Sequence, residues 1–143
     1  MVATSNRRNT RQREAVQHVL AEAAGPLSVQ EILQSAADAT SSLGIATVYR
    51  TLRLLEEDGS IRPVALPDGE IRWEASDRGH HHHFHCRVCS RVLDLPGCPL
   101  HMHGNTVPSG FVVEHHEVTL VGVCPDCAPQ AKKRPAKASA RKP

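Results

Sequence analysis

The pattern of apolar residues changes its period near the middle of the chain. In the first half, apolar residues recur at every third or fourth position, which predicts helices over three segments, 10–24, 28–37 and 45–58. Thr10 is the expected N-cap of the first helix. Ser28 and Glu31 stand at capping-box spacing at the start of the second. Gly59 follows the third and is expected to end it.

A β-like pattern follows these helices. Residues 61–75, IRPVALPDGEIRWEA, hold two β-favouring runs on either side of a Pro-Asp-Gly turn. Three helices followed by a hairpin predict a winged helix-turn-helix, whose third helix would enter the major groove of DNA. Beyond His80 there are four short β-like runs, at 84–86, 92–95, 111–113 and 118–123. We therefore predict an α+β fold, in which residues 96–110, rich in proline and glycine, hold at most a short helix.

These changes of pattern divide the chain into three predicted parts. They are a winged-helix DNA-binding domain with a basic arm over residues 1–78, a metal-binding domain over 79–128, and a disordered basic tail over 129–143. Of 17 basic residues, six lie in 132–143 without an acidic residue, and four arginines lie in 7–13. The rest of the chain is acidic, a distribution that favours local contact with a polyanion.

The chain shows no signal for a membrane or for export. It has no run of about 18 apolar residues, which a spanning helix requires, and its N-terminus lacks an apolar signal region. We therefore expect a cytoplasmic protein with no membrane partner. In a reducing compartment the five cysteines are more suited to binding metal than to forming disulfides.

Four cysteines form two CxxC pairs, Cys86 with Cys89 and Cys124 with Cys127. Each pair places two sulfurs on one side of a tight turn, and together they predict a structural Zn²⁺ site, because four thiolates leave the ion no open position. Two separate redox pairs are the alternative, but no thioredoxin-like βαβ pattern surrounds them. Residues 90–123 separate the pairs, more than the about 15–20 residues of a zinc ribbon, so an insertion is expected.

Four consecutive histidines, residues 80–83, precede the first CxxC pair. Successive side chains of a strand point to opposite faces, so His81 and His83 would face one way and His80 and His82 the other. We therefore predict that neighbouring histidines serve different metals and are not merely solvated. The residues alone leave open which face receives each of four further candidate ligands: Glu74, Asp94, His101 and His116.

Three stretches occur together in this order: GIATVYRTLRLLEEDGSI (44–61), HHHHFHCRVC (80–89) and VVEHHEVTLVGVCPDC (112–127). On these motifs, and over about residues 10–127, the chain resembles the ferric uptake regulator family of bacterial metal-sensing repressors. The resemblance implies an N-terminal winged helix, a small C-terminal α/β dimerisation domain with structural zinc, and metal-loaded homodimers that bind palindromic double-stranded DNA operators.

The resemblance also implies roles for individual residues. The structural zinc falls on Cys86, Cys89, Cys124 and Cys127. A regulatory site at the hinge between the domains falls on Glu74, His81, His83 and Asp94. A second site in the dimerisation domain falls on His80, His82, His116 and, where the family has an acidic ligand, His101. The expected DNA contacts are Arg11, Arg13, Thr47, Tyr49 and Arg50. No role follows for His85, and Cys98 is expected to be a buried or loop thiol, with a spare ligand or redox-sensitive group as alternatives.

The choice of metal follows from the number of ligands. Many iron and peroxide sensors of the family have a histidine before the second helix, where this chain has Pro26 and Leu27. Fewer ligands suit tetrahedral Zn²⁺, so we expect a repressor of zinc uptake genes, of the zinc uptake regulator type. Regulation by Fe²⁺ or Mn²⁺ is the alternative.

Other functional classes have weaker support. His115-x-Glu117 followed by Cys124-x-x-Cys127 is similar to a zinc deaminase signature, but the gap is short and Pro125 lies inside the second pair. A zinc hydrolase and a metal storage protein or chaperone are therefore lesser alternatives, because neither needs a winged helix. We expect no enzyme and no small organic ligand.

Overall fold

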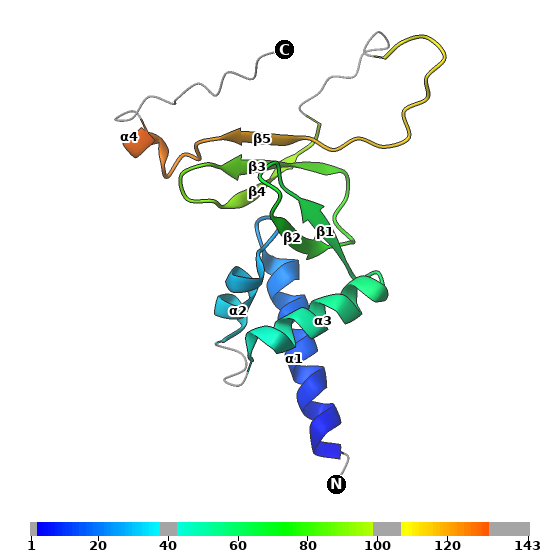
Figure 1. The fold of residues 1–143 in the computed structure, drawn as a ribbon, viewed down its shortest axis with the longest axis vertical. Coiled ribbons are helices and arrows are strands. Elements are labelled where there is room, and N and C mark those ends of the chain that lie inside the picture. Colours follow the sequence, from blue (N-terminus) through cyan, green and yellow to red (C-terminus); the bar gives the residue numbers. More distant parts are fainter. Residues whose placement is uncertain (1–2, 38–42, 99–106, 132–143) are drawn as a thin grey trace.

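The computed structural model describes the backbone of residues 3–37, 43–98 and 107–131. Its elements are α1 (Ala3–Glu22), α2 (Val29–Ala37), α3 (Ile45–Glu57), β1 (Ile61–Ala65), β2 (Ile71–Ala75), β3 (His81–Cys86), β4 (Val92–Pro96), β5 (Thr119–Gly122) and α4 (Ala128–Ala131). Helices α1 to α3 lie at one end of the molecule and the sheet of β3, β4 and β5 at the other, with the β1–β2 hairpin between them (Figure 1).

Helices α1, α2 and α3 share one aliphatic core. Its fully buried side chains stand at helical spacing and are Val16, Leu20, Ile32, Val48, Leu52 and Leu55. The predicted capping box forms at the start of α2, where the Ser28 backbone N–H donates to Glu31 Oε2 at 2.8 Å and the Glu31 N–H donates to Ser28 Oγ at 3.3 Å. Gly59 follows α3 with a φ of 76°, a conformation that side chains disfavour.

The wing is an antiparallel hairpin that is bonded to the loop before α2. Strands β1 and β2 pair from Ile61 with Ala75 to Ala65 with Ile71. Leu27 and Trp73 add an isolated bridge, exchanging two backbone hydrogen bonds of 2.9 Å each. Arg72 and Glu74 alternate with more exposed neighbours and are buried. This bridge ties the edge of β2 to the loop before α2.

The second sheet has the order β4-β3-β5, with β4 antiparallel and β5 parallel to β3. Its small core consists of Cys86, Cys124 and Cys127, with Phe84, Leu93 and Val123 packed against them. A core this small buries little apolar area, and small units of this kind usually need an additional cross-link or partner.

The wing and the second sheet are in direct contact. Val92 on β4 forms a small apolar cluster with Val64 and Leu66 of the wing. Gly25 lies against the β4 backbone so closely that an added Cβ would be 2.3 Å from the Val92 carbonyl oxygen. The Asp94 N–H donates to the Ala24 carbonyl at 2.9 Å. Only glycine at position 25 permits this approach.

The α+β class and the three helices with a following hairpin are confirmed, but several boundaries were wrong. Helix α1 begins at Ala3, so Thr10 lies inside it. Residues 111–113 form no regular strand, and β3 begins at His81, before the predicted start. Residues 128–131 form the short helix α4 where the tail was expected to begin. Element ends are the least well specified by local pattern, and in β3 pairing with β4 and β5 extends the strand back to His81.

Two further expectations concern residues that lie mostly outside the described part of the chain. The predicted short helix within 96–110 falls largely on residues 99–106, and most of the basic tail on 132–143, both outside them. Among the described residues, no helix is long and apolar enough to cross a membrane.

Candidate metal centres

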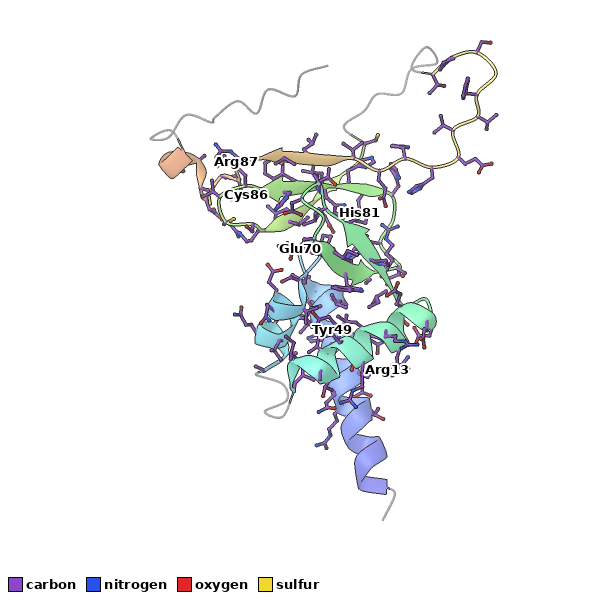
Figure 2. All side chains as sticks on the ribbon, viewed as in Figure 1. Arg13, Tyr49, Glu70, His81, Cys86 and Arg87 are labelled. Atoms are coloured by element: carbon purple, nitrogen blue, oxygen red, sulfur yellow. The ribbon has the colours of Figure 1, made fainter. Side chains whose placement is uncertain are left out.

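Glu74, His81, His83 and Asp94 bring four ligand atoms together between the wing and the second sheet. Glu74 Oε2 lies 3.0 Å from Nε2 of both histidines, which lie 3.2 Å from each other. Asp94 Oδ1 is 3.8 Å from His81 Nε2 and 3.7 Å from His83 Nε2. Figure 2 shows His81 at the end of the sheet that adjoins the wing. We call these four residues the hinge cluster.

Strand geometry explains why these side chains meet. His81 and His83 share one face of β3, and His83 is paired with Asp94 of β4. Glu74 comes from the end of β2, whose inward face is directed at the same point. The wing therefore supplies one ligand atom and the second sheet supplies three.

Arginines hold the outer oxygen of each carboxylate. Arg62 Nε donates to Glu74 Oε1 at 2.6 Å, so Oε2 remains directed at the histidines. Arg78 donates to Asp94 Oδ2, and Asp94 Oδ1 is buried without a hydrogen-bond partner among the described residues. Such a buried oxygen costs about 1–3 kcal/mol unless a cation or donor reaches it. The cluster is therefore suited to a cation.

The charges in the hinge cluster favour ionised carboxylate. Burial raises the pKa of Glu74, but hydrogen bonds from His83, His81 and Arg62 outweigh it and lower that pKa to about 2. Burial lowers the pKa of His81, while hydrogen bonds to the Gly79 carbonyl and to Glu74 raise it above its ordinary value. A tetrahedral ion with bonds of about 2.0–2.2 Å to four such ligands has ligand-to-ligand edges of about 3.3–3.6 Å, close to the distances present.

Cys86, Cys89, Cys124 and Cys127 form a second group of converging ligand atoms. Cys89 Sγ lies 3.8 Å from Cys124 Sγ, which matches the edge of about 3.8 Å for a tetrahedron with Zn–S bonds of about 2.3 Å. Burial raises the pKa of Cys86, but backbone N–H groups, those of Cys89 and Cys124 foremost, lower it to about 6. The thiol hydrogen bond with Cys124 raises the pKa of Cys127 to about 12. Four adjacent thiolates repel one another, so all four ionise together only around a cation.

The third group lies on the opposite face of β3 from the hinge cluster and consists of His80, His82, Cys98 and His116. The ring centroids of His80 and His82 are 4.7 Å apart, and those of His80 and His116 are 4.8 Å apart. Burial, with the neighbouring histidines, lowers the pKa of His82, which favours the neutral imidazole that metals bind. Cys98 was expected to be a buried or loop thiol, with a spare ligand as an alternative, and it was assigned to no site because nothing local brings residue 98 beside residue 116.

Other candidate residues fall outside these groups. His101, the predicted fourth ligand of the second site, lies outside the described residues. His115 is exposed and, among the described residues, belongs to none of the three groups. His85, for which no role was predicted, is buried, with Nε2 3.9 Å from Asp68 in the turn of the wing.

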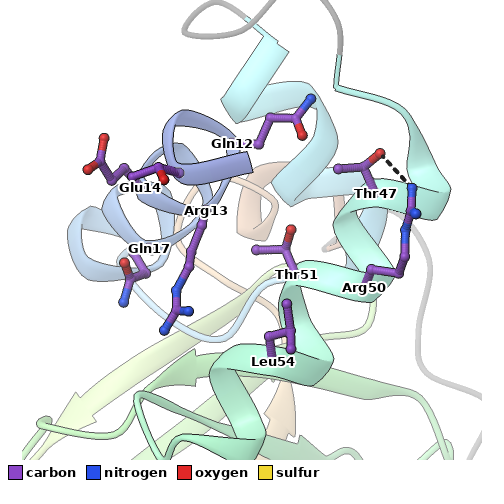
Figure 3. Close-up of a pocket in the computed structure, with 9 residues that line it drawn as sticks. Gln12, Arg13, Glu14, Gln17, Thr47, Arg50, Thr51 and Leu54 are labelled. Atoms are coloured by element: carbon purple, nitrogen blue, oxygen red, sulfur yellow. Dashed lines mark hydrogen bonds between the residues drawn. The ribbon is translucent and has the colours of Figure 1, made fainter. Parts of the chain in front are cut away.

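Helix α3 presents the predicted DNA contacts on an exposed face. Tyr49 is 54% exposed and Arg50 is exposed, with Arg50 Nη2 donating to Thr47 Oγ1 at 3.5 Å. A groove of about 520 Å³ lies between α1 and α3 (Figure 3). Arg13 lines this groove and pairs with Asp58, while Arg11 is exposed on α1.

Comparison with known proteins shows the family to which the chain belongs. The sequence profile of the ferric uptake regulator family matches residues 4–121. The chain belongs to this family. Its members are metal-responsive transcriptional regulators that bind DNA and metal ions.

Individual relatives include proteins named for different metals. The ferric uptake regulation protein of Campylobacter upsaliensis is 34% identical over 104 residues, which span 71% of this chain and 65% of that protein, less than two thirds of its length. A Helicobacter pylori ferric uptake regulator, described as having three functional metal binding sites, has a TM-score of 0.68 at 25% identity and 89% coverage of both chains. FurB of M. tuberculosis, a zinc uptake regulator, has a TM-score of 0.51 at 27% identity, covering 88% of this chain and 99% of that one.

Proposed function

We propose that this protein is a metal-responsive repressor that binds palindromic DNA operators as a metal-loaded homodimer and controls zinc uptake genes. The observation that carries the proposal is the hinge cluster, in which Glu74 of the wing meets His81, His83 and Asp94 of the second sheet. An ion held there joins the DNA-binding half to the other half. The four-cysteine and second-site clusters are proposed as additional metal sites, the first of them structural zinc.

Metal binding at the hinge acts by linkage. An ion bound to all four residues favours the orientation in which Glu74 lies beside β3 and β4, and it shifts the population only by its higher affinity for that orientation. Arg78 extends this connection, because it contacts Asp94 and also donates to the Leu20 and Ala23 carbonyls at 2.9 and 2.6 Å. The end of α1 is therefore connected to a metal ligand through one side chain.

The proposed DNA contacts lie on α3 and α1. Tyr49, Arg50 and Thr47 would face the major groove, with Arg50 donating to base edges or phosphate. Arg11 and Arg13 would contact the backbone, which requires Arg13 to exchange its pairing with Asp58 for phosphate. The exposure of Tyr49, Arg50 and Arg11 and the adjacent groove support this assignment.

Exposed apolar side chains on the second sheet support a homodimer. Leu120 and Val121 on β5 are 42% and 55% exposed, and the preceding segment exposes Phe111, Val112 and Val113. Large apolar side chains left exposed to water often mark a surface that binds another protein copy. Pairing of two copies here would hold two α3 helices for half-sites about 34 Å apart. In this scheme residues 1–78 bind DNA, residues 79–128 bind metal and dimerise, and residues 129–143 add basic charge in the cytoplasm.

Zinc is the proposed regulatory metal because the hinge cluster offers two imidazoles and two carboxylates, a set of four that suits tetrahedral Zn²⁺. The likeness to the M. tuberculosis zinc uptake regulator supports this choice. Fe²⁺ is the second candidate, favoured by the similarity to the Campylobacter ferric uptake regulation protein, and Mn²⁺ is the third.

The decisive test is a titration of each metal against DNA affinity. Protein treated with a mild chelator is titrated separately with Zn²⁺, Fe²⁺ and Mn²⁺, and its binding to the promoter of its neighbouring gene cluster is followed by fluorescence anisotropy. We expect Zn²⁺ to increase affinity by at least about tenfold, a coupling free energy of about 1.4 kcal/mol. His81→Ala should retain the fold and lose this response.

A matched variant separates sensing from folding. Cys86→Ser should lose the fold of the second sheet as well as DNA binding, which circular dichroism and limited proteolysis would reveal. If none of the three metals changes the DNA affinity, the proposal of a metal-responsive regulator is wrong. A response to Fe²⁺ alone would retain the regulator and replace the proposed metal.

A further inference from the structure

Cys98 lies beside the histidines of the second site. It follows Gly97, whose φ of 74° turns the chain sharply after β4. Cys98 Sγ lies 3.3 Å from His116 Nε2 and the side chain is half-buried. The turn therefore directs a thiol towards a histidine that is 18 residues away in the sequence.

Three imidazoles surround this thiol. His80 and His82 flank the start of β3, and His116 precedes β5, with its ring centroid 5.0 Å from that of His82. Each of the four residues offers a ligand atom within 4.8 Å of the others. A tetrahedral ion with a Zn–S bond of about 2.3 Å and Zn–N bonds of about 2.0–2.1 Å has a sulfur-to-nitrogen edge of about 3.5 Å. The Cys98–His116 distance is close to that edge.

Among the described residues, one buried ring nitrogen of His82 has no hydrogen-bond partner. His82 is 1% exposed, and its Nδ1 accepts a hydrogen bond from the Val118 N–H at 3.1 Å. Its Nε2 is buried and has no hydrogen-bond partner among the described residues. Because Nδ1 accepts, the neutral ring carries its proton on Nε2, so an ion can bind at Nε2 only when this proton is released.

We propose that Cys98 is a ligand of the second site, which thereby becomes a site of three imidazoles and one thiolate. The inference rests on the second metal site of the proposed function and changes its ligand set, because Cys98 takes the position assigned to His101 from the family resemblance. A thiolate ligand favours Zn²⁺ over Mn²⁺ and Fe²⁺, since the softer sulfur binds those harder ions less well. The second site would then bind Mn²⁺ and Fe²⁺ more weakly than a site with a carboxylate in place of the thiolate.

Cobalt spectroscopy tests this ligand directly, because Co²⁺ bound to a thiolate shows a sulfur-to-metal charge-transfer band that nitrogen and oxygen ligands do not give. Full-length reduced protein is prepared with one Zn²⁺ per chain in the four-cysteine cluster, verified by elemental analysis, and is titrated with Co²⁺. The hinge cluster has no sulfur, so a new charge-transfer band should come from Cys98. Cys98→Ser should lose the band, and His116→Ala should lose both the band and one equivalent of Co²⁺.

Two controls separate the possible outcomes. Glu74→Ala disrupts the hinge cluster and should leave the band unchanged, and retention of one Zn²⁺ per chain excludes exchange in the four-cysteine cluster. If Cys98→Ser keeps the wild-type spectrum while His116→Ala loses one Co²⁺, the second site stands and Cys98 is not its ligand. If both variants bind Co²⁺ as wild type does, the second site itself is wrong. The regulator proposal remains separately tested by DNA affinity.

Discussion

At the scale of single residues, arginines donate hydrogen bonds to the candidate metal ligands without being ligands themselves. Arg62 and Arg78 each hold one carboxylate oxygen and leave the other directed at His81 and His83. Arg91 has a related role at the cysteines, where Nε lies 3.4 Å from Cys89 Sγ and Nη2 lies 3.6 Å from Cys124 Sγ. Four thiolates around Zn²⁺ carry a net negative charge, which a guanidinium stabilises.

Replacing Arg91 should make the four-cysteine cluster more reactive. Without these N–H···S hydrogen bonds the thiolates, and exposed Cys89 in particular, become better nucleophiles. Arg91→Gln should release zinc roughly tenfold faster to a colorimetric chelator in the presence of a thiol reagent. Arg87→Gln, an exposed arginine on the same turn, is the matched control and should behave as wild type. Equal release rates for all three proteins would exclude a protective role for Arg91.

At the scale of elements, the loop before α2 determines how the two halves fit together. Gly25 lies against β4, Leu27 pairs with Trp73 of the wing, and Ser28 with Glu31 caps α2. Within four residues this loop contacts the second sheet, the wing and a helix. A change here affects the relative position of three elements while leaving the helical core unchanged.

Gly25→Ala tests this junction. The added Cβ would lie 2.3 Å from the Val92 carbonyl oxygen, so β4 must move away from the loop. We expect a loss of about 1–3 kcal/mol in the free energy of unfolding and weaker Zn²⁺ binding at the hinge, because Asp94 moves with β4. Calorimetry and zinc titration measure these quantities. Gly79→Ala is the control, since its Cβ would meet nothing within 4 Å, and an equal effect there would contradict the proposed role of the contact.

At the scale of the whole molecule, the hinge cluster and Arg78 connect the proposed metal site to the helices that we propose bind DNA. Arg78 contacts Asp94 and two carbonyls at the end of α1, whose other residues line the groove beside α3. Coupling between metal binding and DNA binding requires two relative orientations of the halves for which the ion has different affinities. Arg78 is the side chain that ties the position of α1 to the ligand Asp94.

Arg78→Ala should uncouple metal binding from DNA binding. Glu74, His81, His83 and Asp94 all remain, so Zn²⁺ should still bind at the hinge, while the ratio of DNA affinities with and without Zn²⁺ falls by at least about fivefold. Isothermal titration measures the first quantity and fluorescence anisotropy the second. Arg87→Ala serves as the control. An unchanged ratio of DNA affinities would show that coupling does not pass through Arg78.

The sequence by itself determined what depends on local geometry. Helical spacing predicted α2 and α3 within a residue or so, and the Ser28–Glu31 spacing predicted the capping bonds. Alternation along β3 predicted that His81 and His83 separate from His80 and His82, as the groups of ligand atoms are arranged. These features repeat every two to four residues, so neighbouring residues specify them without help from distant parts of the chain.

Tertiary structure decided which distant residues complete each group. Pairing of β3 with β4 brings Asp94 beside His83, and the turn at Gly97 brings Cys98 to His116. The fit of Gly25 against β4 and the contacts of Arg78 likewise depend on how the two halves pack. Such contacts join segments that are far apart in the sequence and leave no repeating pattern in it. Only the packing of the whole chain specifies them.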